Sequence, residues 1–148
     1  MNDKINKRLK SEIKIKDSYI SIHFRNTDIK NNITDFILKI RNLDTNIKTI
    51  YLASDDNSSY DILQKELPDF IIIRNTIPPK NITNLHYCSD ACNDKYNEVY
   101  NCIRDIYFIL NSTYFIQSKN SGLSQYIILM IENKNYLISD IKNIPIII

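Results

Sequence analysis

The sequence predicts an α/β fold: one Rossmann-like, doubly wound parallel sheet in a single domain that spans residues 1–148. Strand-like apolar runs alternate with segments of helical periodicity, a pattern typical of parallel strands, which need crossover connections. The length of 148 residues suits one domain whose core buries roughly 70% of the unfolded surface. No internal repeat divides the chain.

Strands are predicted where short runs rich in β-branched and aromatic residues stand between polar segments. The run FIIIR is almost fully apolar, as expected for a strand buried on both of its faces. Two shorter runs near the C-terminus are candidate edge strands. The predicted strands are 18–24, 48–54, 70–74 and 113–118, and the candidate edge strands are 136–139 and 145–148.

Helices are predicted where apolar residues recur every three to four positions. Seven apolar or aromatic residues from Tyr96 to Leu110 fit one helix face, and we interpret the stripe from Tyr96 to Tyr107 as core packing. Ser58 or Ser59 is expected to cap the second helix, which Pro68 follows. The predicted helices are about 32–44, 58–67, 96–110 and 121–133, with residues 1–16 as an N-terminal lead-in helix or extension. Residues 75–94 form a long loop, and loops of that length are usually functional or disordered.

Composition argues against several function classes. A net charge of +2, 24% charged residues and no basic tract with interleaved aromatics argue against nucleic-acid binding. No run approaches the roughly 20 apolar residues of a membrane span, and the N-terminus has no apolar signal core. Three cysteines without such a signal predict reduced thiols and a cytoplasmic protein.

The loop motif HYCSDAC places His86, Cys88 and Cys92 close together. This is half of a zinc site, which needs four ligands. We therefore expect no metal there and interpret the cysteines as reduced thiols, with a Cys88–Cys92 disulfide as the alternative in an oxidising compartment.

Polar side chains follow the first and fourth predicted strands. In the common strand order 3-2-1-4-5 these strands are neighbours, so residues 23–28 and 117–122 flank one crevice. Backbone N–H groups and the dipole of the following helix make such a turn an anion site, and Arg25 offers a bidentate guanidinium opposite. The turn adds neutral donors from Ser118, Asn120, Ser121 and the backbone of Gly122, the chain's only glycine.

These groups predict a diphosphate clamp that needs no metal. The structural alternative stays open, because polar strand ends are ordinary in such sheets and Ser and Asn are ordinary helix caps. A single glycine cannot form a phosphate-cradling Gly-rich loop.

Three segments resemble the GDP-fucose-dependent fucosyltransferases of the α-1,6, α-1,2 and protein-O types. ISIHFRNTD is similar to that family's His-x-Arg-x-Thr-Asp segment, and IYLASDD to its strand ending in Ala-Thr/Ser-Asp-Asp. DIYFILNSTYFIQSKNSGLSQYIILM is similar to its third segment. The three occur in the family's order over residues 18–131. The resemblance implies the C-terminal, nucleotide-sugar-binding half of a two-domain GT-B transferase, which inverts the anomeric centre without a metal or other cofactor.

The resemblance also implies roles for single residues. Arg25 would hold the β-phosphate of GDP-fucose and, as the one catalytic candidate, stabilise the departing GDP. His23 would lie beside the nucleoside, and Asp105 would accept hydrogen bonds from guanine N1–H and N2–H₂. Asp55 would contact ribose or support the site. The rest of the expected substrate-binding set is Asp28, Ser118, Asn120, Ser121 and the Gly122 backbone.

Each role has a structural alternative. For Arg25 it is a surface salt bridge, and for His23 a packed histidine. For Asp105 it is an exposed helix acid paired with Arg104 or a lysine. For the Asp55–Asp56 pair it is a solvated turn that caps helix 58–67.

Four positions depart from the family pattern. Asn26 replaces a second arginine, and Ile29 and Ile33 replace a lysine and a glutamate, so no catalytic base is identified. Gly122 replaces a glutamine and leaves only a backbone donor.

The chain has room for one of the two domains, so we expect a second chain or domain to supply the acceptor site. The alternatives are a non-catalytic nucleotide- or glycan-binding module, and an unrelated α/β interaction domain that uses the 75–94 loop.

Overall fold

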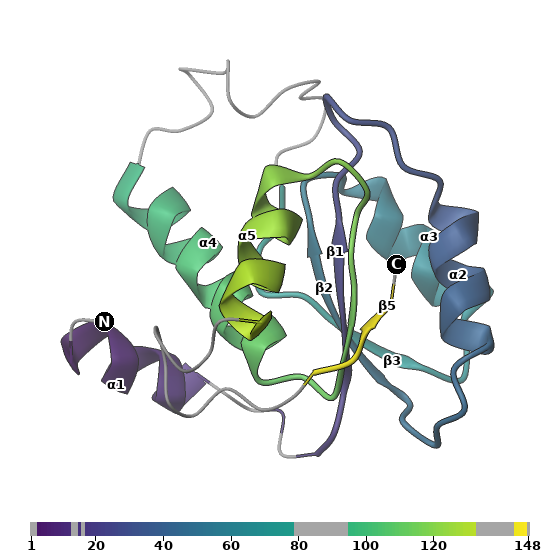
Figure 1. Cartoon of the computed structure of the whole chain (residues 1–148), viewed down its shortest axis with the longest axis horizontal. Coiled ribbons are helices and arrows are strands. Elements are labelled where there is room, and N and C mark those ends of the chain that lie inside the picture. Colours follow the sequence, from purple (N-terminus) through teal and green to yellow (C-terminus); the bar gives the residue numbers. More distant parts are fainter. Residues whose placement is uncertain (1–2, 13–14, 16, 79–94, 133–143, 148) are drawn as a thin grey trace.

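β1 (Ile20–Phe24) lies at the centre of a five-stranded parallel sheet in the order β3-β2-β1-β4-β5 (Figure 1). This computed structural model describes residues 3–12, 15, 17–78, 95–132 and 144–147. All four strand pairs are parallel, which confirms the predicted α/β class and strand order. The remaining strands are β2 (Thr49–Ser54), β3 (Ile71–Ile73), β4 (Tyr114–Ile116) and β5 (Ile146–Ile147).

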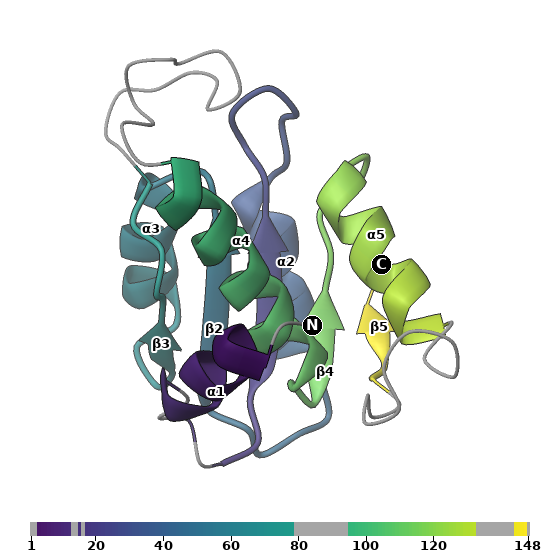
Figure 2. The same ribbon diagram turned by 90° about the vertical axis from the view of Figure 1, so that its left-hand side faces the viewer.

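Helices cover both faces of the sheet. One face carries α2 (Ile33–Arg41) and α3 (Ser58–Glu66), and the other carries α4 (Lys95–Leu110) and α5 (Gly122–Glu132). α1 (Asp3–Glu12) lies against α4, most clearly in Figure 2. Within the described residues, no helix is long and apolar enough to cross a membrane.

The alternation of side chains along the strands divides the core into two layers. Ile20, Ile22 and Phe24 of β1 pack with α2 and α3, while Tyr51 and Ala53 of β2 pack with α4 and α5. Successive side chains point to opposite faces of a strand, so the remaining residues of β1 face the α4 and α5 layer. They are Ser21, whose Oγ lies 2.8 Å from Ser112 Oγ, and His23.

Three local predictions are wrong. β3 is an edge strand rather than a strand buried on both faces, and Ile71 is 65% exposed. The cap of α3 is Asn57, and Asp56 Oδ1, rather than a serine hydroxyl, accepts from the Ser58 N–H at 2.9 Å.

The third concerns the α4 stripe, whose first turn is exposed and which is buried only from Tyr100 onwards. Tyr100 and Leu110 are buried, but Tyr96 and Val99 are 66% and 60% exposed. Of the candidate edge strands, 145–148 gives β5, whereas 136–139 lies outside the described residues, as does loop 75–94 beyond Pro78 and with it His86, Cys88 and Cys92.

Candidate functional site

The carboxyl ends of β1 and β2 open on a cleft of about 180 Å³. Residues from the ends of β1 and β2, from the segment after β3 and from α4 line it, and Leu123 at the start of α5 closes one side. The cleft brings together four residues singled out from the sequence: His23, Arg25, Asp55 and Asp105. These residues lie up to 82 positions apart in the chain (105 − 23).

Arg25 is held by acids within the protein. Its Nε and Nη2 donate to Asp28 Oδ1 and Oδ2 at 2.7 and 2.6 Å, and Asp55 Oδ2 lies 4.0 Å from Nε. The hydrogen bond from Arg25 lowers the pKa of Asp28 to about 2, so this carboxylate is ionised at neutral pH. Asp28 therefore occupies the guanidinium fork that a phosphate would use.

Asp55 joins the loops after β1 and β2. Its Oδ1 accepts from Asn26 N at 2.8 Å, and its Oδ2 accepts from Thr27 Oγ1 at 2.6 Å. The neighbouring Asp56 accepts from Asn26 Nδ2 at 2.8 Å. Burial opposes ionisation of Asp56, but hydrogen bonds from Asn26 and Ser58 outweigh it and lower its pKa. These contacts give Asp55 a supporting position at the cleft wall, and they give Asn26 a structural use where the family pattern has arginine.

Asp105 is buried rather than exposed, with 9% of its surface accessible. Tyr51 Oη donates to its Oδ1 at 2.5 Å, and Thr76 Oγ1 lies 3.3 and 3.2 Å from Oδ1 and Oδ2. Burial raises the pKa of Asp105 to about 6, against the opposing effect of the hydrogen bonds from Tyr51 and Thr76. At pH 7 the cleft thus contains a buried carboxylate that is mostly ionised.

His23 is both packed and at the cleft. Its Nδ1 lies 2.7 Å from Ser124 Oγ on α5, and 7% of its surface is accessible. Burial lowers the pKa of His23 to about 4, and the nearby Arg25 charge acts in the same direction, against Asp55. The imidazole is therefore neutral at pH 7 and presents an uncharged ring to a ligand.

The predicted neighbours β1 and β4 do meet, and Ser118 joins them. Its Oγ donates to the His23 carbonyl at 2.8 Å and accepts from Arg25 N at 2.8 Å. Ser118 is fully buried, so its hydroxyl is used within the protein. Asn31 makes a second link between the same loops, with its Nδ2 donating to the Arg25 carbonyl at 2.7 Å and its Oδ1 accepting from Lys119 N at 3.2 Å.

The rest of the predicted anion turn lies beside the cleft and does not line it. Ser121 is fully buried, and its Oγ accepts from Ser124 N at 3.4 Å as the cap of α5. Asn120, with φ of 58°, has a left-handed backbone conformation, which asparagine adopts more readily than most residues other than glycine. Gly122 is the first residue of α5, and a Cβ there would meet no atom within 4 Å.

Sequence reasoning missed four residues that shape the site. Tyr51 is the one with a readable signal, because a tyrosine inside an apolar strand needs a partner for its hydroxyl. Ser124, Thr76 and Asn31 had no signal: each is a common polar residue whose partner is distant in the chain, and asparagine is abundant in this sequence.

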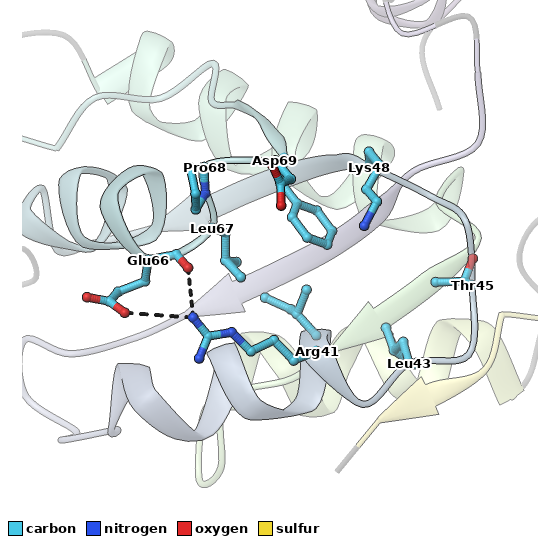
Figure 3. Close-up of a pocket in the computed structure, with 10 residues that line it drawn as sticks. Arg41, Leu43, Thr45, Lys48, Glu66, Leu67, Pro68 and Asp69 are labelled. Carbon is cyan, nitrogen blue, oxygen red and sulfur yellow. Dashed lines mark hydrogen bonds and ion pairs between the residues drawn. The ribbon is translucent and has the colours of Figure 1, made fainter.

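A second cavity of about 380 Å³ lies at the opposite, amino edge of the sheet (Figure 3). Its apolar lining includes Ile40, Leu67 and Phe70, and at its rim Arg41 Nη2 donates to the Glu66 carbonyl at 2.8 Å. It contains none of the residues singled out from the sequence. In the part of the chain that the structure describes, no group of three His, Cys, Asp or Glu side chains could hold a metal ion.

No protein-family model and no curated protein matches the chain. Its fold is similar to that of the α-1,6-fucosyltransferase NodZ soaked with GDP-fucose, with a TM-score of 0.55 and 17% identity over 84% of this chain and 40% of that chain. For NodZ co-crystallised with GDP the TM-score is 0.53, with 16% identity over 86% and 41%.

A structure of the fucosyltransferase NodZ from Bradyrhizobium gives a TM-score of 0.54 and 16% identity over 86% and 42% of the two chains. The chain thus spans well under half the length of the structures that it matches. At this identity the comparison shows that the chain has the α/β, Rossmann-like fold of part of a GT-B fucosyltransferase, and no more than the fold.

Proposed function

We propose that this chain is the donor-binding domain of a glycosyltransferase and binds GDP-fucose or a related GDP-sugar. One observation carries the proposal: three separate chain segments, the ends of β1 and β2 and helix α4, bring His23 and Arg25, Asp55, and Asp105 into one cleft. The fold around that cleft is shared with a fucosyltransferase whose structure was determined with GDP-fucose.

In this proposal Asp105 recognises the base by hydrogen bonds. An ionised carboxylate accepts from the adjacent N1–H and N2–H₂ donors of guanine, a pair that uracil and adenine do not present. Among the described residues, the Thr76 hydroxyl at 3.2 Å is the one hydrogen-bond partner of Oδ2, so this oxygen keeps acceptor capacity. The neutral ring of His23 packs beside the nucleoside.

Arg25 binds the β-phosphate, which either displaces the Asp28 carboxylate from the guanidinium or binds the guanidinium beside it. The first turn of α5 adds its dipole and backbone N–H groups, so Ser118, Asn120, Ser121 and Gly122 contribute through loop shape and backbone. Because negative charge grows on the departing diphosphate, both elements stabilise the transition state more than the ground state. With this charge stabilisation from Arg25 and α5, the proposed displacement, which inverts the anomeric centre, requires no metal.

The acceptor site and its base come from a second domain or chain in this proposal. Ile29 and Ile33 cannot take a proton from an acceptor hydroxyl. The cleft volume of about 180 Å³ is also below the roughly 300–1,000 Å³ of usual small-molecule sites. A cleft of that size suits a nucleoside, with the sugar and acceptor enclosed by another surface.

A non-catalytic nucleotide-binding module is the second candidate. The Arg25–Asp28 ion pair favours it, because a guanidinium already paired with a carboxylate gives less help to a leaving diphosphate. Ile77, which lines the cleft, and Tyr96 and Val99 in the first two turns of α4 are large exposed apolar residues. They favour a third candidate, an interaction domain without nucleotide.

Calorimetric titration with GDP, GDP-fucose, UDP and ADP separates these functions. We expect GDP and GDP-fucose to bind, UDP and ADP to bind at least about tenfold more weakly, and Arg25→Ala to lose about 2 kcal/mol or more of the GDP binding free energy. Arg41→Ala, which removes an arginine ion-paired to Glu66 at the other edge of the sheet, is the matched control and should bind GDP normally.

Absence of any nucleotide response leaves only the interaction domain. GDP binding without hydrolysis or transfer of GDP-fucose, even with candidate partner chains added, favours the non-catalytic module.

A further inference from the structure

Arg104 lies next to Asp105 on α4, yet its hydrogen bonds go to the segment after β3. Its Nη2 donates to the Asn75 carbonyl at 2.8 Å and approaches Thr76 Oγ1 at 3.3 Å. Both acceptors belong to the segment that leaves β3 and borders the cleft. Arg104 thus fastens that segment to α4 without itself hydrogen-bonding to the Asp105 carboxylate.

The contact fixes the direction of the Thr76 hydroxyl. A guanidinium has donors and no acceptor, and a threonine hydroxyl has one proton. When Arg104 donates to Oγ1, that single proton is free to be given to Asp105, whose two oxygens lie 3.3 and 3.2 Å away. Tyr51 donates to the same carboxylate from β2 at 2.5 Å, so Asp105 is held as an acceptor from two directions.

Arg104 is in turn held by α1. Its Nη1 lies 3.8 Å from Glu12 Oε2, and Arg8 Nε donates to Glu12 Oε1 at 3.0 Å. The ring of Tyr100 lies under both arginines, 3.9 Å from Arg8 Cζ and 5.9 Å from Arg104 Cζ. The Arg104 side chain is only 15% exposed. A continuous series of contacts therefore runs from the N-terminal helix to the floor of the cleft.

We propose that Arg104 is a positioning residue for base recognition, which acts through Thr76 to hold Asp105 as an acceptor and is itself held by Glu12 of α1. The inference deepens the proposed function and rests on it. It makes the N-terminal helix part of the apparatus that distinguishes guanine, although no residue of α1 lines the cleft.

The pKa of Asp105 depends on other groups besides Thr76 and Arg104. Burial raises its pKa, while Tyr51, Thr76 and the Arg104 charge lower it and Glu98 raises it. Cys102, on the same helix, is itself affected by the Asp105 charge. Removing the Thr76 hydroxyl or the Arg104 charge therefore raises the pKa of Asp105 and extends its neutral form towards pH 7.

The test uses four variants of the full chain. Thr76→Val removes the hydroxyl at almost unchanged volume, and Arg104→Met removes the charge. Thr76→Ser keeps the hydroxyl and should restore wild-type behaviour. Arg41→Met, at the far edge of the sheet, is the matched arginine control.

The first readout is the carboxyl ¹³C shift of Asp105 as a function of pH, without ligand. The midpoint should rise by roughly one pH unit in Thr76→Val and Arg104→Met, and stay at the wild-type value in Thr76→Ser and Arg41→Met. Unchanged midpoints in both of the first two variants overturn the inference, and this readout does not depend on nucleotide binding.

The second readout is the ratio of the dissociation constants for inosine diphosphate and GDP between pH 5.5 and 8. Inosine lacks the 2-amino donor, so the ratio isolates base recognition from the titration of the phosphates. In Thr76→Val and Arg104→Met the preference for GDP should fall several-fold at pH 6.5 and recover at pH 8. A preference that matches wild type at every pH overturns the inference, whereas a wild-type protein without any preference overturns the proposed function instead.

Discussion

At the scale of single residues, two buried titratable groups meet in one cleft with pKa values shifted in opposite directions. Burial lowers the pKa of His23 to about 4 and raises that of Asp105 to about 6. In both cases the neutral form is favoured by the surroundings, because charge is costly away from water. Pairs of groups with divergent shifts are common at functional sites, and this pair borders the space where we place the nucleoside.

His23 should make stability depend on pH in a predictable direction. The unfolded chain binds a proton near pH 6.5 and the folded chain near pH 4. Stability from neutral His23 is therefore fully present above pH 6.5 and falls as pH drops to 4, by up to about 3 kcal/mol. Asp105 has the opposite effect, because its folded pKa lies above its unfolded value of 3.8: the folded chain takes up that proton first, and stability rises as pH falls from about 6.

Urea unfolding of wild type and His23→Asn across pH 4–7 isolates the histidine, since Asp105 contributes to both proteins. We expect the difference in the free energy of unfolding to change by 2–3 kcal/mol, roughly, over this range. A difference that stays constant with pH would show that His23 is protonated equally in the folded and unfolded chains.

At the scale of elements, the sequence pattern predicted the parallel α/β class. With the common strand order assumed, it also predicted the edge where side chains converge, but not the packing around them. The central strand β1 was recognisable from its run of β-branched and aromatic residues, and all five of its residues are buried. The prediction that β3 is buried on both faces was wrong because the sequence III suits both a central strand and an edge strand. Which of the two it is depends on which strands lie next to it. The α4 stripe was overextended because helical spacing does not tell how far along the helix the core reaches.

The same limit applies to the site. Arg25 and His23 follow from the polar end of an apolar strand, and Asp105 follows from resemblance. Nothing in the local sequence indicates that the Asp28 carboxylate pairs with the Arg25 guanidinium. Nor does it indicate that the Ser118 hydroxyl bonds to the backbone at the end of β1 rather than to a ligand. Both facts depend on side-chain directions that only the folded chain defines.

The junction of β1 and β4 should depend on Ser118. Alanine at this position removes the acceptor of the Arg25 N–H and the donor to the His23 carbonyl. Because two backbone groups at the buried strand ends lose their partner, Ser118→Ala should destabilise the fold by about 2–3 kcal/mol. Ser11→Ala, at an exposed helix position where the hydroxyl bonds to the Arg8 carbonyl, is the control and should change stability by less than about 0.5 kcal/mol. Equal effects of the two substitutions in chemical unfolding would contradict this assignment.

At the scale of the whole molecule, the described residues form a doubly wound parallel sheet with a cleft at its carboxyl edge. The structural match with the fucosyltransferase NodZ includes 84% of this chain but only 40% of the NodZ chain. In the proposal, a second domain or chain supplies the surface that binds the acceptor and the catalytic base. The domain then binds the nucleotide alone, and transfer requires the complementary surface.

The most direct test of the central claim is to exchange the base specificity. Xanthine carries a carbonyl where guanine carries the 2-amino group, so an amide can donate where a carboxylate would accept. Titration calorimetry of wild type and Asp105→Asn, each with GDP and with xanthosine diphosphate, gives four dissociation constants to compare. We predict that wild type prefers GDP and that Asp105→Asn reverses the order, each by at least about tenfold. An unchanged preference for GDP in Asp105→Asn would contradict a guanine-reading carboxylate in this cleft.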